Sequence, residues 1–233
     1  MKAIVTINTY NEKDNIGTLL KGITALGPGI EAVVADDDSP DGTWQIVQEM
    51  SRTNPAIHLL RRTSDKGRGS AGRDAFQYAF EHGAELILEM DGDLSHDPRF
   101  IPALIRAAET YDVVIGSRYI SGGRDSRKSV ARNTLSRISN AYSRMMLGIS
   151  VRDCNSGYRC FRRRVFETIA PLSIRSQGPS IVHELLYRAF KKGFSIGEVP
   201  IDFVDRIHDE SKLTLVRLLN GMLTVLKLRL GLF

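Results

Sequence analysis

Short apolar runs rich in β-branched residues alternate with longer amphipathic stretches over the first half of the chain. The runs predict buried strands at residues 3–7, 32–35, 57–60, 86–90 and 113–115. Between them, apolar residues recur at helical spacing over 15–25, 43–50, 71–80 and 100–108. This alternation predicts an α/β fold whose mainly parallel central sheet carries helices on both faces.

The second half of the chain is less regular. Residues from about 129 onward favour helix, and YRCF (158–161) and IGEVPIDFV (196–204) predict two further strands at or near the edge of the sheet. No repeat or linker interrupts the pattern. We therefore expect one domain over 1–212, followed by an amphipathic helix over 213–233.

The C-terminal segment is apolar but interrupted by charge. Thirteen of its 21 residues are apolar, and Arg217, Lys227 and Arg229 lie among them. A charge at the centre of a bilayer costs about 2.5–3.5 kcal/mol, so a spanning helix is disfavoured and a helix lying in the membrane interface is favoured. The alternative is a helix packed on the domain core or in a dimer.

A polar cluster follows each of the five predicted strands. The clusters are TYNE (9–12), DDDSPDGT (36–43), DKGRG (65–69), DGDLSHD (91–97) and GSRYISGGR (116–124). In open α/β sheets, ligands bind at the carboxyl ends of the strands. The chain has neither the glycine-rich dinucleotide fingerprint nor a phosphate-binding loop. A nucleotide bound here must therefore be held by side chains, loop amides or a metal ion.

Composition narrows the class of protein. The chain is 42% hydrophobic and 25% charged, which is typical of one globular domain. Its two cysteines, Cys154 and Cys160, lack the spacing of a zinc site and are too few for a disulfide scaffold. We find neither a signal segment nor an uncharged apolar stretch of membrane-spanning length. These features favour a cytoplasmic location.

Charge is segregated along the sequence. Residues 1–116 carry 11 basic and 18 acidic side chains, whereas 117–164 carry 12 basic and 2 acidic ones. An acidic region suits a divalent cation and a basic block suits phosphate, although solvated helix faces also produce charge runs. The basic block has few aromatic residues for base stacking and no helix-turn-helix or zinc-finger pattern. We therefore do not expect nucleic acid as a partner.

Two carboxylates separated by one glycine, Asp91 and Asp93, follow the fourth predicted strand. At a strand end this spacing lets both approach one Mg²⁺ or Mn²⁺ ion, with Ser95 as a further ligand. The alternative is that Asp93 caps a helix beginning near Pro98. Three aspartates at 36–38 favour the cation, because so much negative charge at one sheet edge needs a counterion.

Arg118 opens the basic block directly after the fifth predicted strand. Its planar guanidinium suits phosphate oxygens, and Gly122 and Gly123 allow the loop that follows to move over a ligand. The aspartates of DDDSPDGT can accept hydrogen bonds from a nucleotide base or from ribose, although Pro40 and Gly42 also mark an ordinary turn.

Taken together, these motifs resemble the family 2 glycosyltransferases of the GT-A fold, and in particular their dolichyl- or polyprenyl-phosphate mannosyltransferase branch. The resemblance extends over roughly residues 4–212 and rests on TYNE (9–12), DDxSPDGT (36–43), MDGDLSHDP (90–98), DVVIGSRYIxGG (112–123), Dx2SGYR (153–159), Ex3RA (184–189), EVPI (198–201) and Rx4SK (206–212). The chain departs from the usual pattern at Asp38, Gly92, Asp209 and 176–183. The last departure leaves the sugar open.

The resemblance implies three groups of binding residues and a catalytic set. Asp91, Asp93 and Ser95 would hold Mg²⁺ or Mn²⁺ on the donor diphosphate. The nucleotide-sugar would lie against Thr9, Tyr10, Glu12, Asp36, Asp37, Asp41, Arg206 and Lys212. Arg118 and Arg132 would hold a lipid phosphate, and the catalytic set would be Asp91, Asp93, Arg118 and Asp153.

The implied activity is an inverting, metal-dependent transfer of a hexose, mannose from GDP-mannose, to dolichyl or polyprenyl monophosphate at the cytosolic face of a membrane. A phosphomonoester with a second pKa of about 6 is already mostly dianionic, so we expect Asp153 to orient groups rather than to remove a proton. The alternatives are another donor (UDP-glucose or UDP-GlcNAc), a saccharide acceptor, or a nucleotide-sugar-binding module without activity. A membrane-protein partner or a homodimer stays open.

Overall fold

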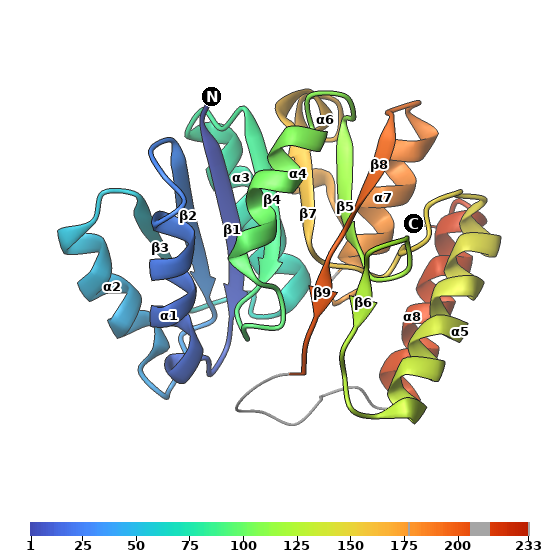
Figure 1. Ribbon diagram of the computed structural model, residues 1–233, viewed down its shortest axis with the longest axis horizontal. Helices are drawn as coiled ribbons and strands as arrows, with labels where there is room; N and C mark the ends of the chain where they lie inside the picture. Colours follow the sequence, from blue (N-terminus) through green and yellow to red (C-terminus); the bar gives the residue numbers. More distant parts are fainter. Residues whose placement is uncertain (177, 206–214, 233) are drawn as a thin grey trace.

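The computed structural model describes residues 1–176, 178–205 and 215–232. Within them, a central sheet of seven strands runs in the order β3-β2-β1-β4-β7-β5-β8 (Figure 1). Its strands are β1 (Ala3–Thr9), β2 (Ile30–Asp36), β3 (Ile57–Arg61), β4 (Leu86–Asp91), β5 (Val113–Ser117), β7 (Arg159–Arg162) and β8 (Ile196–Pro200). The first five confirm the strands predicted from the apolar runs, and each contains the predicted segment.

The sheet is mainly parallel, as the alternation of strands and helices predicts. β1 pairs in parallel with β2 and with β4, β2 with β3, and β5 with β8. A shorter pair, β6 (Arg124–Asp125) and β9 (Asp202–Phe203), forms a separate two-stranded ribbon. The carboxyl ends of β1, β2 and β4 therefore meet at one edge, where the polar clusters lie.

The predicted edge position of YRCF is wrong. β7, which contains most of this segment, lies inside the sheet between β4 and β5 and is antiparallel to both. Cys160 and Phe161 are fully buried, because β7 is hydrogen-bonded on both sides and covered on both faces. Strand order depends on pairing between segments far apart in the chain, and the local hydrophobic pattern does not predict this pairing. The other late strand, β8, does lie at the edge.

Helices cover both faces of the sheet, as predicted. Alternate residues of each strand point to opposite faces, so Val5 of β1 packs in one apolar cluster and Ile4 in the other. The Val5 cluster includes residues of α1 (Lys13–Thr24), α2 (Thr43–Thr53) and α4 (Ile101–Ala107). The Ile4 cluster includes residues of α3 (Arg68–Glu81), α6 (Arg163–Thr168) and α7 (Ile181–Lys191).

Two longer helices, α5 (Val130–Leu147) and α8 (Leu215–Arg229), lie side by side beyond the β8 edge (Figure 1). Val225 and Leu228 of α8 are buried in the Ile4 cluster, so part of this helix belongs to the domain core. Leu223 of α8 and Leu230, directly after the helix, are exposed. No helix in the described part of the chain is long and apolar enough to cross a bilayer.

Candidate active site

The parallel register brings three predicted site residues to the same edge of the sheet. Thr9 at the end of β1 is aligned with Asp36 at the end of β2, and Asn8 is aligned with Asp91 at the end of β4. The Thr9 hydroxyl donates a hydrogen bond to Asp36 Oδ2 at 2.7 Å. The sheet therefore places the DDDSPDGT and DGDLSHD loops beside each other.

Asp93 lies buried in the turn that follows β4, where Leu94 adopts a left-handed φ of 62°. Its Oδ1 accepts hydrogen bonds from the backbone N–H and the hydroxyl of Ser95. The helix cap is supplied instead by Asp97, whose Oδ1 accepts from Arg99 N–H at the start of η1 (Pro98–Phe100). The alternative explanation of Asp93 as a helix cap is therefore wrong.

His96 fixes the backbone of Asp91 through a hydrogen bond. The Asp91 N–H donates to His96 Nδ1 at 3.0 Å, and the ring stacks on Tyr158 with centroids 4.9 Å apart. Burial lowers the pKa of His96, so this nitrogen is kept as an acceptor. A Cβ at Gly157 would lie 3.0 Å from Arg68 Nη2, so a larger residue there would require the Arg68 side chain to shift.

Arg118 is held by Asp153 in a buried, two-pronged ion pair. Arg118 Nε and Nη2 donate to Asp153 Oδ2 and Oδ1, both at 2.8 Å, and the backbone N–H of Arg118 adds a bond to Oδ2 at 3.1 Å. Burial opposes the charged form of Arg118, but the hydrogen bonds and charge of Asp153 outweigh it and raise the pKa of this arginine. Among the described residues, Arg118 Nη1 has no hydrogen-bond partner.

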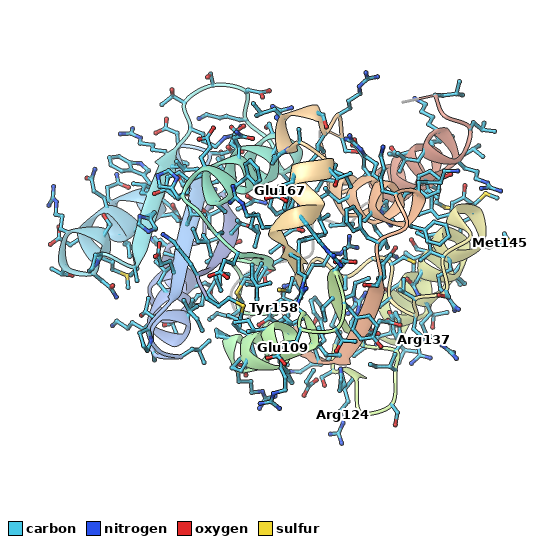
Figure 2. The ribbon with its side chains drawn as sticks, turned by 90° about the horizontal axis from the view of Figure 1, so that it is seen from above. Glu109, Arg124, Arg137, Met145, Tyr158 and Glu167 are labelled. Atoms are coloured by element: carbon cyan, nitrogen blue, oxygen red, sulfur yellow. The ribbon has the colours of Figure 1, made fainter. Side chains whose placement is uncertain are left out.

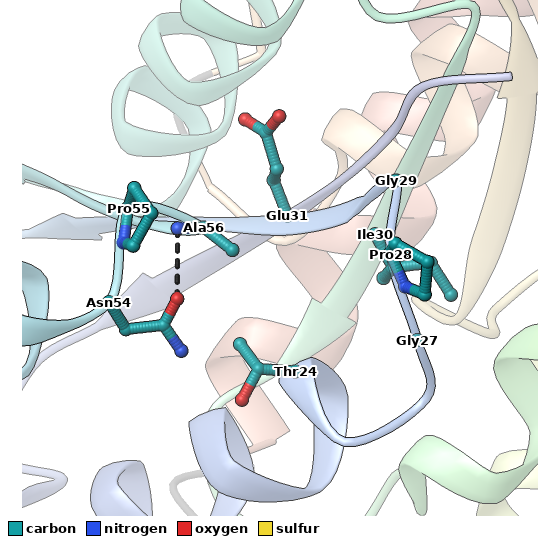
Figure 3. Close-up of a pocket in the computed structure, with 9 residues that line it drawn as sticks. All are labelled: Thr24, Gly27, Pro28, Gly29, Ile30, Glu31, Asn54, Pro55 and Ala56. Carbon is teal, nitrogen blue, oxygen red and sulfur yellow. Dashed lines mark hydrogen bonds between the residues drawn. The ribbon is translucent and has the colours of Figure 1, made fainter.

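Asp91, His96 and Arg118 line one cavity of about 110 Å³ at the carboxyl edge of the sheet, whereas Asp93 and Asp153 are not among its described lining residues. Its lining includes Arg68, Asp91, His96, Arg118 and Asn155. A carboxylate suited to a cation and a guanidinium suited to phosphate therefore face the same small space. A larger hollow of about 510 Å³ lies at the opposite, amino-terminal ends of β2 and β3 (Figure 3). Its one ionisable side chain, Glu31, is paired with Lys2 and His58.

The aspartates predicted to contact the nucleotide also order their own loops. Asp36 is fully buried and accepts from Ser39 as well as from Thr9. Asp37 pairs with buried Arg62 and accepts from Gly67 N–H at 2.7 Å, which joins the 36–43 loop to the start of α3. Asp41 accepts from the backbone and hydroxyl of Thr43 and from the Lys13 N–H. Their nucleotide contacts stay predictions.

The remaining predicted residues are placed unequally. Tyr10 is 49% exposed at the end of β1, and Glu12 accepts from the Asn15 amide at the start of α1. The side chain of Arg132 and the whole of Arg206 and Lys212 lie outside the described residues.

Two charged residues at the site were not predicted from the sequence: Arg68, which lines the cavity, and Glu89, which lies against Arg68. Arg68 Nη2 lies 2.9 Å from Asp91 Oδ1 and 3.8 Å from Glu89 Oε1. The charge of Asp91 raises the pKa of Arg68, and burial raises the pKa of Glu89 to about 7. A charged residue inside the apolar run LILEM was the signal that could have identified Glu89.

The donor set fits a hard cation that is shared with a ligand. Within the described ranges, no group of three or more His, Cys, Asp or Glu side chains forms a metal cage. Asp91 and Asp93 supply carboxylate oxygens, the ligands that Mg²⁺ and Mn²⁺ prefer, and a diphosphate commonly completes such a site. The residues present therefore suit a metal ion that takes its other ligands from a bound diphosphate.

Comparison with solved structures identifies the fold. A glucosyl-3-phosphoglycerate synthase from Mycobacterium tuberculosis, solved in complex with Mn²⁺, UDP-glucose and phosphoglyceric acid, superimposes with a TM-score of 0.71 at 20% sequence identity. The match covers 99% of this chain and 80% of that chain. Because the sequence identity is low, this likeness shows the fold alone, the GT-A arrangement expected from the sequence.

Curated relatives are more similar in sequence. A polyprenol monophosphomannose synthase from Mycolicibacterium smegmatis is 36% identical over 91% of this chain and 81% of its own length. An undecaprenyl-phosphate mannosyltransferase from Micrococcus luteus is 35% identical over 92% of this chain and 88% of its own length. A dolichol-phosphate mannosyltransferase from Pyrococcus furiosus is 36% identical over 91% of this chain, which spans 59% of that protein.

The family model "Glycosyl transferase family 2" matches residues 4–170. This range contains every described element from β1 to α6 and the cavity-lining residues Arg68, Asp91 and Arg118. With the fold, the site and the relatives in agreement, the chain belongs to the family 2 glycosyltransferases and is an enzyme of this family.

Proposed function

We propose that this protein transfers mannose from GDP-mannose to a polyprenyl monophosphate, with inversion at the anomeric carbon and with a divalent metal ion on the donor. The observation that carries the proposal is the shared cavity of about 110 Å³, in which Asp91 faces the same space as Arg118. The names of the three curated relatives support mannose as the sugar and a polyprenyl phosphate as the acceptor.

The donor end of the cavity is the carboxylate end. Asp91 and Asp93 would hold Mg²⁺ or Mn²⁺, which supplies positive charge to the diphosphate leaving group. His96 keeps the end of β4 in place through the Asp91 N–H. Thr9, Tyr10 and the 36–43 loop lie along the adjacent strand ends, where the nucleoside would be bound.

The acceptor end is the guanidinium end. Asp153 occupies Nε and Nη2 of Arg118, which leaves Nη1 to donate to an acceptor phosphate oxygen. Asp153 is fully buried with both oxygens engaged, so it suits orienting Arg118 rather than removing a proton. A phosphate dianion needs no base to become a nucleophile at neutral pH.

A lipid acceptor requires the site to reach a membrane surface. Exposed apolar side chains on α5 and α8 alternate with cations, a combination that binds at an anionic interface. They are Val130, Ile138 and Met145 on α5, Leu223 and Leu226 on α8, and Leu230 directly after α8, with Arg137, Lys227 and Arg229 among them. Figure 2 shows Met145 at the periphery of the molecule, with Arg137 on the same helix. We propose that this face rests on the cytosolic leaflet.

A donor panel tests the proposed reaction. The full chain is incubated with Mn²⁺, a short polyprenyl phosphate and, in separate reactions, radiolabelled GDP-mannose, UDP-glucose or UDP-GlcNAc. We expect labelled lipid from GDP-mannose only, and none when the metal is chelated. Labelled lipid from a UDP-sugar would show that the proposed donor is wrong. Labelled product formed only with a saccharide acceptor would show that the proposed acceptor is wrong. Nucleotide binding without any product would indicate a binding module.

A further inference from the structure

Arg68, the first residue of α3, lies against two carboxylates of β4. Its Nη2 is 2.9 Å from Asp91 Oδ1, a hydrogen-bonding distance, and 3.8 Å from Glu89 Oε1. Glu89 and Asp91 are two positions apart on one strand, so their side chains point to the same face of the sheet, the face that α3 covers. One guanidinium is therefore within reach of both carboxylates.

Glu89 is an unusual partner because its hydrogen-bonding capacity is unused. It is 1% exposed, and neither of its oxygens accepts a hydrogen bond from any described residue. Its register partner on β7, Arg159, donates instead to the backbone oxygens of Ser156, Cys154 and Val182. Arg68 Nε is also without a partner among the described residues. A buried carboxylate without hydrogen bonds is costly, so an arginine within 4 Å is its natural donor.

Arg68 and a metal ion would compete for the same oxygen. Asp91 Oδ1 cannot accept from a guanidinium at 2.9 Å and ligate a divalent cation at the same lone pair, and the two positive charges repel each other. We infer that Arg68 is an internal competitor of the divalent metal for Asp91, and that Glu89 is the acceptor to which Arg68 moves when the metal takes Asp91. This inference rests on the metal role of Asp91 and Asp93 in the proposed function.

The arrangement has a consequence for the order of binding. A bare metal ion gains only two protein carboxylates as ligands when it displaces Arg68. A metal ion already bound to a nucleoside diphosphate has phosphate ligands of its own, and the phosphate oxygens can accept hydrogen bonds from the displaced guanidinium. Arg68 therefore disfavours the bare ion more than the metal–diphosphate complex.

The test measures Mn²⁺ affinity directly, by the loss of the free-ion electron paramagnetic resonance signal on titration of the full chain without nucleotide. We expect Arg68→Met to bind Mn²⁺ about two- to fivefold more tightly than the unchanged protein, the factor that a partly exposed ion pair corresponds to. Glu89→Gln should bind it more weakly, because Arg68 then keeps Asp91 as its charged partner. In the Arg68→Met background, Glu89→Gln should have no further effect.

Arg73→Met is the matched control. It removes one positive charge from the same helix, but Arg73 pairs with Asp65 at 2.7 Å, and the pair includes neither Glu89 nor Asp91. Its Mn²⁺ affinity should equal that of the unchanged protein, and a gain equal to that of Arg68→Met would mean that net charge alone is responsible and would overturn the inference. Arg68→Lys, which keeps the charge, should remain close to the unchanged protein. Thermal melting of each variant confirms folding, and the comparison of Arg68→Met with Arg73→Met stands even if Glu89→Gln unfolds.

The same titration separates this inference from the proposed function. If Asp93→Asn binds Mn²⁺ as well as the unchanged protein does, the metal role of the carboxylate pair is wrong. If Asp93→Asn loses Mn²⁺ while Arg68→Met binds it no more tightly than before, the metal role stands and the competition is wrong.

Discussion

Arg118 at the turn after β5 and Asp153 in the loop before β7 form a buried ion pair with two hydrogen bonds of 2.8 Å. The two residues are 35 positions apart, and each was selected from the sequence for a separate role. In the structure they form one unit: Asp153 holds the guanidinium plane, and the plane faces the cavity that Asp91 also lines.

Asp153→Asn should act through Arg118. The substitution removes the negative charge that neutralises a buried guanidinium, and breaking a buried pair in this way typically costs about 3–5 kcal/mol. We expect a lower free energy of unfolding and a higher KM for the polyprenyl phosphate, measured by urea denaturation and steady-state kinetics. Arg118→Lys, which keeps the charge but loses the fork, should raise the same KM. A thousandfold loss of kcat with normal stability and KM would assign Asp153 a role as a base instead.

Asp93→Asn should abolish metal-dependent turnover without unfolding the protein. The Asn side chain can still accept from Ser95 N–H and hydroxyl, so the turn after β4 is retained, whereas a preferred oxygen ligand for a hard cation is lost. Turnover with Mn²⁺ and thermal melting are measured together. Asp97→Ala is the control from the same loop: it removes the cap of η1, costs about 1 kcal/mol of stability and should leave metal affinity unchanged.

Replacing Leu223 and Leu230 with serine should weaken binding to anionic vesicles. Both side chains are exposed, Leu223 on α8 and Leu230 directly after it, whereas Val225 and Leu228 of α8 belong to the core, so deleting the whole segment would damage the fold. Flotation of the full chain with vesicles rich in anionic lipid measures the effect. Leu172→Ser is the control, since Leu172 is as exposed as Leu230 but lies on η2 (Pro171–Ser173). Equal flotation of all variants would exclude the α8 face as the docking surface.

Stability should fall as the pH drops below about 6.5, in part because of His183. Its Nε2 bonds Asn155 Oδ1 at 2.8 Å, its Nδ1 is buried without a partner among the described residues, and burial, followed by the charge of Arg159, lowers its pKa to about 3. The unfolded chain takes up a proton on this residue near pH 6.5 and the folded chain does not, so the unfolded state binds more protons and gains in relative stability as the pH falls.

The contribution of His183 amounts to about 2 kcal/mol between pH 6.5 and pH 5. Urea denaturation at both pH values should therefore show a smaller difference for His183→Gln than for the unchanged protein. An identical difference in the two proteins would show that His183 is not kept neutral in the folded state.

Much of the fold and the position of the site follow from local sequence. The alternation of apolar runs and amphipathic stretches determines the first five strands and the helices between them, because burial of each run depends on residues within it. The polar clusters lie at the carboxyl edge because parallel strands all end on the same side. The spacing of Asp91 and Asp93 after an apolar run is likewise a local signal.

Tertiary structure decided what depends on contacts between distant segments. β7 lies in the middle of the sheet because its pairing with β4 and β5 buries Cys160 and Phe161. The stabilisation from this burial depends on distant strands, so no local sequence pattern predicts it. The pairing of Arg118 with Asp153, and the position of Arg68 between Asp91 and Glu89, arise in the same way. The residue types were readable from the sequence, but the electrostatic partners were not, because the energy of a charge depends on distances that only the folded chain sets.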